Sequence, residues 1–481
     1  MLQKRLGQRI ADLRKNRRLT QTELAKAVGC SVEFISLVER GVNAPSVARL
    51  ADFARALKVE VVDLFTFTGR MPTRIRRLRI SKSGAWTTTR SSNCMKLIVF
   101  LGAGVSEPSG LPMVDQLTQM ILRDPYHQDR DSNFIPGRNP DCVSRQNDPT
   151  AVVRALLGCL SRYDKRGSKN AVYRGAPTYE DLFSLCEAIR LFHIGLADNS
   201  ITTPFVEAIE RAARPILKGT SRKARMLDLG SLASEASRFI QAVVVESLKS
   251  DSVVGLKLIL ELADSAIVEQ LNIVTLNHDT LVEQYLRREG VDVVDGFGPR
   301  DGDVRWYDDR CYDSNPGRVR LFKLHGSVNW RQFTGRTRPA ILLRASSGRI
   351  MDGEKRELKL SLRSPSFLTG VNKAITYQRG IYADAHFRFH EVLRECQLIV
   401  MSGYGWGDTA INWRFDTWLD QDRRNSIILL HPRPEEIAKR SVIVGSAYDY
   451  WIRSRHLLPV PKWLCETSLR DIEGLFHPGT L

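Results

Sequence analysis

The chain has 481 residues, of which 43% are hydrophobic and 26% charged, a balance that excludes an intrinsically disordered protein. A single hydrophobic core usually stops growing near about 250–300 residues, so more than one domain is expected. The formal net charge of +17 fits a nucleic-acid or acidic ligand, but charge alone does not separate these from a solvated surface.

Export, membrane insertion and metal binding are not indicated. The first residues carry charge in every turn, and nowhere do 18 apolar residues run uninterrupted. The eight cysteines are scattered, and no two have C-x-x-C spacing. We therefore expect a cytoplasmic protein with reduced thiols, no structural zinc and no membrane association.

The basic surplus is concentrated at the N-terminus. The first 80 residues hold 17 lysines and arginines against 7 acidic residues. Within them, residues 2–16 place apolar side chains at Leu6, Ile10 and Leu13, the spacing of one buried helical stripe. A first helix is predicted here.

Two further helices are predicted around a tight turn. Thr20 and Glu23 have the spacing of a capping box, and the helix that they begin ends at Gly29. Ser31 caps the next helix, in which Ile35 faces inward. The outer face of that helix, which is expected to enter the major groove of DNA, comprises Ser31, Glu33, Phe34, Ser36 and Arg40.

Over roughly residues 3–65 the chain resembles the Cro/repressor-type helix-turn-helix family, on the stretch TQTELAKAVGCSVEFISLVERGVNAPSVARLADFARAL. The resemblance implies that Gln21 contacts phosphate, that the exposed third-helix residues read bases, and that residues 1–65 bind double-stranded DNA. The alternative is a helical module that docks protein or only dimerises. Residues 66–93 combine Gly, Pro, Ser and Thr with a basic run and are expected to form a linker.

From Met95 onward, short apolar runs alternate with helical stretches, which predicts an α/β fold with a parallel sheet. Each apolar run is followed by a polar or glycine-rich tail, with the sequences GAGVS, NHDT, HGS, GYGWGD and HPRP. Ligands of open α/β sheets bind at the carboxyl ends of strands, so these tails are expected to line one crevice. The five expected strands are 95–101, 271–276, 318–324, 397–402 and 426–430.

Three of these tails carry residues suited to chemistry. Gly102 and Gly104 let backbone amides approach a pyrophosphate, although a packing turn explains a lone G-x-G equally well. The Asn277 amide could order a water or a sugar hydroxyl, and the Asp279 carboxylate could accept from a carboxamide. His325 suits general-base catalysis near neutral pH. Singly, Asp279 fits a helix cap and His325 a buried structural histidine; together they indicate a site.

FLGAGVSEPSGLP, TLNHDTL and KLHGS, in this order, resemble the sirtuin family, especially its bacterial defence-associated branch, over residues 94–440. The resemblance implies a Rossmann-like fold that binds nicotinamide adenine dinucleotide (NAD), with Asn277 and His325 as catalytic residues. The SGYGWGD tail departs from the glycine-threonine-serine pattern usual there. The NAD-binding residues implied by the resemblance are Gly102, Ala103, Gly104, Ser106, Asp279, Gly403 and His431.

Two departures point away from protein deacylation. Deacylating sirtuins carry a zinc module with paired C-x-x-C ligands, which this chain lacks. The loop after SGLP reads Met113-Val114-Asp115, where deacylases usually show aspartate, phenylalanine and arginine. A long insert at about 124–270 has helical spacing and is expected to be a structural layer, a lid or an assembly surface.

The predicted fold class is thus an α/β Rossmann-like parallel sheet with a large helical insert, preceded by a small all-α helix-turn-helix domain. Residues 441–481 are expected to pack on the sirtuin-like domain. The favoured function is an NAD glycohydrolase of antiphage defence, homo-oligomeric and triggered by a phage-derived activator, with NAD as its substrate. The alternatives are an NAD-dependent deacylase or ADP-ribosyltransferase, and a transcriptional repressor that only senses NAD.

Overall fold

The computed structural model forms two compact units, Met1–Arg90, termed the head, and Ser91–Leu481, termed the body. The linker predicted at 66–93 lies outside the described residues. The structure describes residues 2–17, 19–43, 45, 47–57, 59, 64, 95–128, 134–137, 153–154, 156–158, 160, 178–195, 202–218, 228–314, 317–343, 349–361, 367, 377 and 380–476.

The head is helical, and its local signals are confirmed. The Thr20 hydroxyl accepts from the Glu23 N–H at 3.1 Å, while the Glu23 carboxylate accepts from the Thr20 N–H at 2.7 Å. Gly29 ends the helix in the left-handed conformation, with φ of +69°. Ile35 is fully buried in the head's core. The described helices are α1 (Leu2–Asn16), α2 (Gln21–Val28), α3 (Val32–Glu39) and α4 (Val47–Leu57).

The body is built around a parallel sheet whose described strands run in the order β12-β11-β10-β1-β4-β7-β5. All five predicted strands are present, and the Rossmann-like α/β class is confirmed. Their bounds are β1 (Met95–Leu101), β4 (Val268–Thr275), β5 (Val293–Val294), β7 (Val319–Lys323), β10 (Leu398–Ser402), β11 (Ser426–Leu430) and β12 (Leu457–Val460).

The strand order places a topological switch at β1. The chain passes from β1 to β4 and on to the edge strand β5, turns back to β7, then crosses to β10 on the other side of β1 and continues outward. Leu101 is in register with both Thr275 and Ser402, Thr275 with Lys323, and Ser402 with Leu430. The segments that follow these residues therefore leave the sheet along one edge, where such folds bind ligands.

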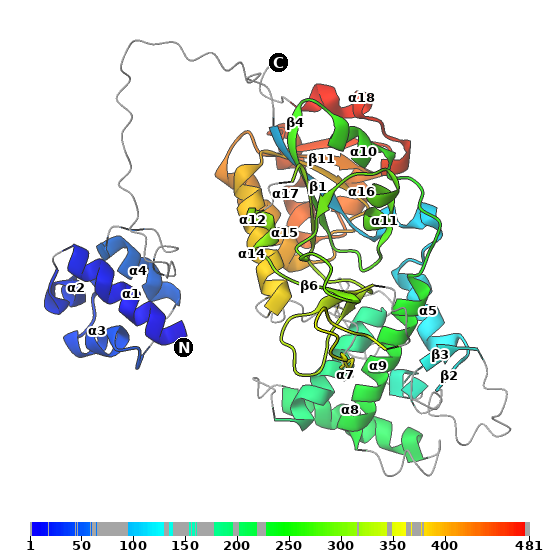
Figure 1. Cartoon of the computed structure of the whole chain (residues 1–481), viewed down its shortest axis with the longest axis horizontal. Helices are drawn as coiled ribbons and strands as arrows, with labels where there is room; N and C mark the ends of the chain where they lie inside the picture. The colour runs from blue at the N-terminus through cyan, green and yellow to red at the C-terminus, as the bar shows by residue number, and fades with distance from the viewer. Residues whose placement is uncertain are drawn as a thin grey trace. The chain divides into compact units, whose positions relative to one another are not determined.

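Helices cover both faces of this sheet, giving three layers (Figure 1). Along β1 the side chains alternate between two cores, as the period of two in a strand requires. Ile98 and Phe100 pack with helices α14 (Gly380–Glu395), α15 (Thr409–Gln421) and α17 (Val442–Arg453). Leu97 and Val99 pack with α10 (Lys257–Asp264), α11 (Leu281–Arg288) and α18 (Leu469–Ile472).

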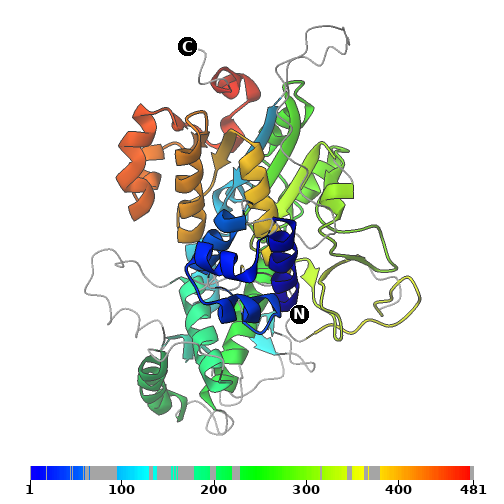
Figure 2. The ribbon, with the colours of Figure 1, turned by 90° about the vertical axis from the view of Figure 1, so that its left-hand side faces the viewer.

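Most of the predicted insert, together with the helix just before it, forms a second, helical core. Its buried residues come from α5 (Val114–Arg123), α7 (Tyr179–His193), α8 (Thr202–Lys218), α9 (Leu229–Ser247) and the hairpin of β2 (Tyr126–Gln128) and β3 (Phe134–Pro136). In both ribbon views these helices lie at the opposite end of the body from α18 (Figures 1 and 2).

Several elements were not predicted. Strand β12 comes from residues 441–481, where the sequence indicated globular packing alone; its Pro459 is tolerated because β12 is an edge strand. The two-residue β5 is too short to show a pattern. A small antiparallel sheet joins β6 (Val304–Trp306), β9 (Ala340–Leu342) and β8 (Trp330–Arg331). Short helices are α12 (Cys311–Ser314) and α16 (Pro434–Ala438). No helix in the described ranges has the length and apolarity needed to cross a bilayer.

Candidate functional site

A cavity of about 470 Å³ lies at the carboxyl edge of the sheet, bounded by the tails of β1, β4, β7, β10 and β11. The predicted convergence of the five tails is therefore confirmed. The nine residues predicted for catalysis or NAD binding all line this cavity: Gly102, Ala103, Gly104, Ser106, Asn277, Asp279, His325, Gly403 and His431.

The glycines of the first and fourth tails lie backbone to backbone. A Cβ added to Gly102 would lie 2.5 Å from the Gly403 carbonyl oxygen, and one added to Gly104 would lie 2.9 Å from the Gly403 Cα. Gly403 itself has φ of +67°. Close packing of two loops thus requires glycine at these positions, whatever part their amides play toward a ligand.

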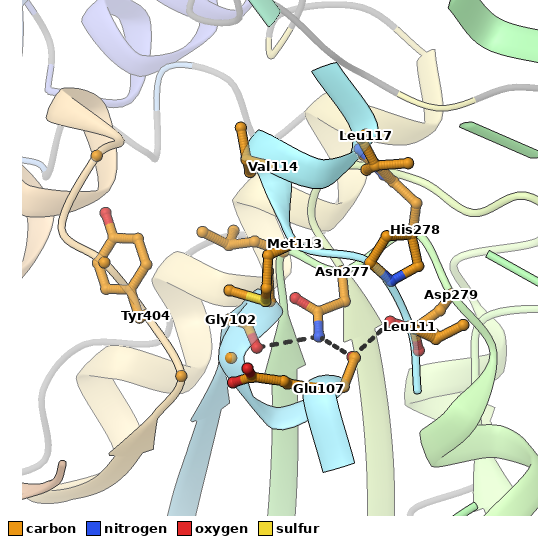
Figure 3. Close-up of a pocket in the computed structure, with 18 of the residues that line it drawn as sticks. Gly102, Glu107, Leu111, Met113, Val114, Leu117, Asn277, His278, Asp279 and Tyr404 are labelled. Carbon is orange, nitrogen blue, oxygen red and sulfur yellow. Dashed lines mark hydrogen bonds between the residues drawn. The ribbon is translucent and has the colours of Figure 1, made fainter. Parts of the chain in front are cut away.

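The β1 and β4 tails are joined by a buried hydrogen-bond chain, which we call the amide wall. The Asn277 Nδ2 group donates to the Gly102 carbonyl oxygen and to the Ser106 hydroxyl, both at 3.1 Å. The Ser106 hydroxyl donates to Asp279 Oδ2 at 2.7 Å. Figure 3 shows Asn277 at the centre of this chain, between Gly102 and Asp279, with its amide oxygen turned away from these partners.

Asp279 has a structural role as well. Its Oδ1 accepts from the Leu281 N–H at 3.0 Å, in the turn that leads into α11, whose N-cap is Thr280. Beneath it, the buried Lys323 ammonium donates to the Asp279 carbonyl oxygen and to Glu283 Oε1, the latter at 2.9 Å. Burial raises the pKa of Glu283. The contacts of Lys323 therefore anchor the segment that carries Asn277 and Asp279.

His325 belongs to a second group of contacts, which we call the imidazole wall. Its Nε2 lies 2.8 Å from the Tyr377 hydroxyl and 3.2 Å from Asp408 Oδ2. The Tyr377 hydroxyl donates to the same Asp408 oxygen at 2.5 Å. Sequence reasoning missed both partners. Asp408 closes the GYGWGD tail and could have been noted there, whereas nothing in the sequence around Tyr377 marks it.

The roof of the cavity is largely apolar. Met113 and Val114 lie over Asn277, and Leu117 continues this surface along α5 (Figure 3). Tyr179 and Glu180, at the start of α7, also line the cavity. The insert is therefore more than a remote layer, because it supplies part of the wall around the predicted catalytic residues.

The far end of the cavity, at the β11 tail, has a different character. His431 Nδ1 accepts from the Arg433 N–H at 3.0 Å, and the ring packs edge-on against Trp463 at 4.7 Å. Burial lowers the pKa of His431, which keeps the ring neutral. Arg433 and Arg440 line the same end. A neutral, partly aromatic surface flanked by arginines suits a base and an anionic group.

In the part of the chain that the structure describes, no three His, Cys, Asp or Glu side chains are grouped as metal ligands would be.

The predicted DNA-reading face of the head is only partly free. Ser31, Glu33 and Arg40 are exposed, whereas Ser36 is half-buried. Phe34 is also half-buried, against the head's core, with the Arg49 guanidinium 5.6 Å from its ring centre. Ser31, Glu33 and Arg40 are therefore more accessible to a ligand than Phe34 and Ser36.

Gln21, predicted to contact phosphate, begins α2 and is held by Glu39. Its Nε2 donates to Glu39 Oε2 at 2.8 Å, while the Arg14 Nε donates to Glu39 Oε1 at 2.6 Å. These bonds tie α1, α2 and α3 together. Gln21 thus occupies a fixed place at the start of its helix.

Comparisons with known proteins identify both parts of the chain. A helix-turn-helix family model matches residues 10–64, and a SIR2-like domain model matches residues 271–450. An uncharacterized HTH-type transcriptional regulator of Sinorhizobium fredii is 38% identical over 71 residues, which cover 15% of this chain and 92% of that protein.

Similar solved structures divide in the same way. The restriction-modification controller protein C.AhdI from Aeromonas hydrophila is 34% identical and covers 13% of this chain and 94% of its own, with a TM-score of 0.13. A sirtuin from a study of substrate affinity is 11% identical over 79% of this chain and 93% of its own, with a TM-score of 0.32. A Sir2 complex with a p53 peptide and NAD⁺ is 12% identical over 74% of this chain and 92% of its own, with a TM-score of 0.28. The chain therefore belongs to the helix-turn-helix family through its head, and its body contains a SIR2-like domain.

Proposed function

We propose that the body is an NAD glycohydrolase, which uses water to cleave the bond between nicotinamide and ribose and releases nicotinamide and ADP-ribose. The observation that carries the proposal is the gathering of Asn277, Asp279 and His325 around one cavity of about 470 Å³ in a SIR2-like domain. Pockets for small molecules typically measure about 300–1,000 Å³.

The chemistry needs little acid catalysis, because nicotinamide leaves as a neutral molecule. The departing ring takes the bonding electron pair, so positive charge develops on the ribose as in sugar hydrolysis. We assign Asn277 to hold the ribose or the attacking water. His325 accepts a proton from that water or from a ribose hydroxyl. Asp279 holds the carboxamide and turns the ring out of conjugation with the sugar.

The remaining cavity residues are assigned to the rest of the dinucleotide. Gly102, Ala103, Gly104 and Ser106, on the tail of β1, are proposed to contact the phosphates. Gly403 and His431 are proposed to contact the adenosine half. Neighbouring strands are about 4.8 Å apart, so the β4 and β11 tails, three strand spacings apart, are separated by about 14 Å, a span suited to an extended dinucleotide.

Water is the favoured acceptor. The part of the cavity lining formed by Met113 and Val114 is apolar, and the sequence has no paired C-x-x-C ligands for a zinc module. Deacylation and ADP-ribosyl transfer are the competing reactions, and both require a second substrate. They are therefore separable from hydrolysis by experiment.

We propose that residues 1–65, within the head, bind a duplex site as a dimer, because one domain of this type reads only a half-site. Gln21 contacts phosphate, and Ser31, Glu33, Phe34, Ser36 and Arg40 form the reading face. The operon that encodes the protein is the proposed target. From the resemblance to the defence-associated branch, we further propose that the protein is a homo-oligomeric antiphage effector. A phage-derived activator is proposed to trigger its activity.

The test is to incubate the purified full chain with NAD, with and without an acetyl-lysine peptide, and to identify the products by mass spectrometry. We expect nicotinamide and ADP-ribose in equal amounts, independent of peptide. Products that form only with the peptide would establish group transfer instead. Tight NAD binding without any product would favour a repressor that only senses the dinucleotide.

A further inference from the structure

Asp408 joins the GYGWGD tail of β10 to helix α15. Its Oδ1 accepts from the N–H groups of Ala410 and Ile411, at 3.0 and 3.2 Å, and so caps the helix. Its Oδ2 faces the other way, toward the Tyr377 hydroxyl at 2.5 Å and His325 Nε2 at 3.2 Å. One carboxylate thus both begins a helix and contacts the proposed base.

The contacts around Asp408 determine where the protons lie. A carboxylate can only accept, so the single Tyr377 proton is donated to Asp408. Burial and the nearby Asp408 charge raise the pKa of Tyr377 well above its ordinary value, which keeps that proton in place. The Tyr377 oxygen and Asp408 Oδ2 are then both acceptors for His325 Nε2. Two independent contacts therefore require hydrogen on Nε2 and place the basic lone pair of neutral His325 on Nδ1.

The pair is shielded from solvent. The side chains of His325 and Asp408 are 4% and 11% exposed, so their attraction is screened far less than that of a surface pair. His278, on the β4 tail, also faces His325, with 6.2 Å between ring centres. Asp408 supplies a negative charge 3.2 Å from His325 Nε2.

Other charged or titratable groups approach from the surrounding helices. His386 on α14 packs on Tyr377 with 3.8 Å between ring centres, and burial lowers its pKa to about 3, so it is uncharged at neutral pH. The positive charge of Arg414 on α15 acts on His386, Tyr377 and Asp408. Glu180 of α7 adds negative charge near Tyr377. Asp408, by contrast, is in direct contact with the His325 ring.

We propose that Asp408 is a positioning residue for His325: it orients the imidazole, holds its proton on Nε2 and stabilises the imidazolium that forms when Nδ1 accepts a proton. This inference rests on the proposed function for its catalytic meaning. Tyr377 bridges the pair and fixes its geometry. Because Asp408 is anchored by the first turn of α15, the imidazole is aligned by a helix rather than by a mobile side chain.

The variant Asp408→Asn removes the negative charge beside His325 but keeps a side chain that can cap α15. Asparagine is as good an N-cap as aspartate, so α15 should still begin at this position. The asparagine NH₂ group, however, favours hydrogen on Nδ1 instead of Nε2. We expect kcat to fall roughly 100-fold with little change in KM. Loss of the carboxylate lowers the pKa of His325, so the acidic limb of the kcat/KM profile moves to lower pH.

Two controls separate position from structure. Asp228→Asn makes the same change at the cap of α9, where Asp228 accepts from the Ser231 N–H at 2.7 Å, and should leave both kcat and the pH profile unchanged. Tyr377→Phe keeps the carboxylate and should shift the profile less than Asp408→Asn. If Asp408→Asn matches the parent in profile and rate, or if it merely lowers the melting temperature, the inference is wrong.

A second measurement does not depend on activity. In protein labelled with ¹⁵N-histidine, the His325 signals are assigned by their loss in His325→Ala, and pH titration gives the tautomer and its midpoint. The parent should show hydrogen on Nε2 and a higher midpoint than Asp408→Asn. If this holds but no nicotinamide is released, the proposed function fails and the positioning role stands. If nicotinamide is released but tautomer and midpoint are the same in both proteins, the positioning role fails alone.

Discussion

The two walls of the cavity are assembled from different parts of the chain. The amide wall is made by two adjacent strand tails, and the Asn277 side chain donates across them to the Gly102 carbonyl oxygen and to the Ser106 hydroxyl. The imidazole wall draws His325 from a strand tail and Asp408 from a helix cap, and Tyr377 joins them from a position between these two in the sequence. The first wall is suited to hold a substrate still, and the second to move a proton.

The largest expected effect comes from removing the central residue of either wall. Asn277→Ala and His325→Ala should each reduce nicotinamide release by about 10²- to 10⁴-fold, the usual contribution of a general base or a transition-state contact. His390→Ala, at an exposed position of α14, is the matched control and should retain the parent rate. Melting curves must show that each variant is folded. Parent-like turnover in a folded Asn277→Ala or His325→Ala protein would refute the assigned chemistry.

A smaller effect, on stability, is expected at the close contact between the β1 and β10 tails. A Cβ at Gly403 would lie 2.5 Å from the Val105 nitrogen and 2.7 Å from the Gly102 oxygen, at φ of +67°. Gly403→Ala should therefore lower the free energy of unfolding by about 1–3 kcal/mol and disturb the Gly102 loop. Gly405→Ala, where a Cβ meets nothing within 4 Å, should change it by less than about 0.5 kcal/mol. Equal melting temperatures for the two variants would contradict the close packing described here.

In the head, an effect of similar free energy is expected on DNA binding. Arg40→Ala should weaken binding to the cognate duplex by about 1–3 kcal/mol if it reads a base, and reduce the salt dependence by about one counterion if it contacts phosphate. Arg55→Ala, an exposed arginine on α4, is the control. Gel shifts across a salt series distinguish these outcomes. Equal preference for upstream and random duplex would remove the DNA-reading role.

The smallest effect is expected from metal removal. We predict no stoichiometric zinc, from the cysteine spacing, so chelation should change neither the melting temperature nor turnover. Elemental analysis of protein purified without added metal checks this. One zinc per chain would favour the deacylase alternative.

The comparison of the walls also explains what could be predicted from sequence. The amide wall was predictable because each of its residues directly follows an apolar run, and parallel strands deliver such residues to one edge. Strands β1, β4, β7, β10 and β11 were visible for the same reason. Asp408 and Tyr377 were missed because their contacts with His325 depend on two events, the start of α15 at Asp408 and the packing of Tyr377, 52 residues away in the sequence, against the ring. Neither event leaves a local pattern. Strand β12 was missed because four residues that include a proline have no clear period.

The central claim is that water, not a protein acceptor, captures the ribose. Reaction in H₂¹⁸O tests it directly: mass spectrometry should find one ¹⁸O in the ADP-ribose formed by the parent, with equal nicotinamide, and almost no product from His325→Ala. Quenching the reaction early limits later exchange of oxygen between the released ADP-ribose and the solvent. Unlabelled ADP-ribose incubated in the same labelled water measures how much of this exchange occurs. ADP-ribose without ¹⁸O, or labelled product that appears only when an acetyl-lysine peptide is present, would contradict the account.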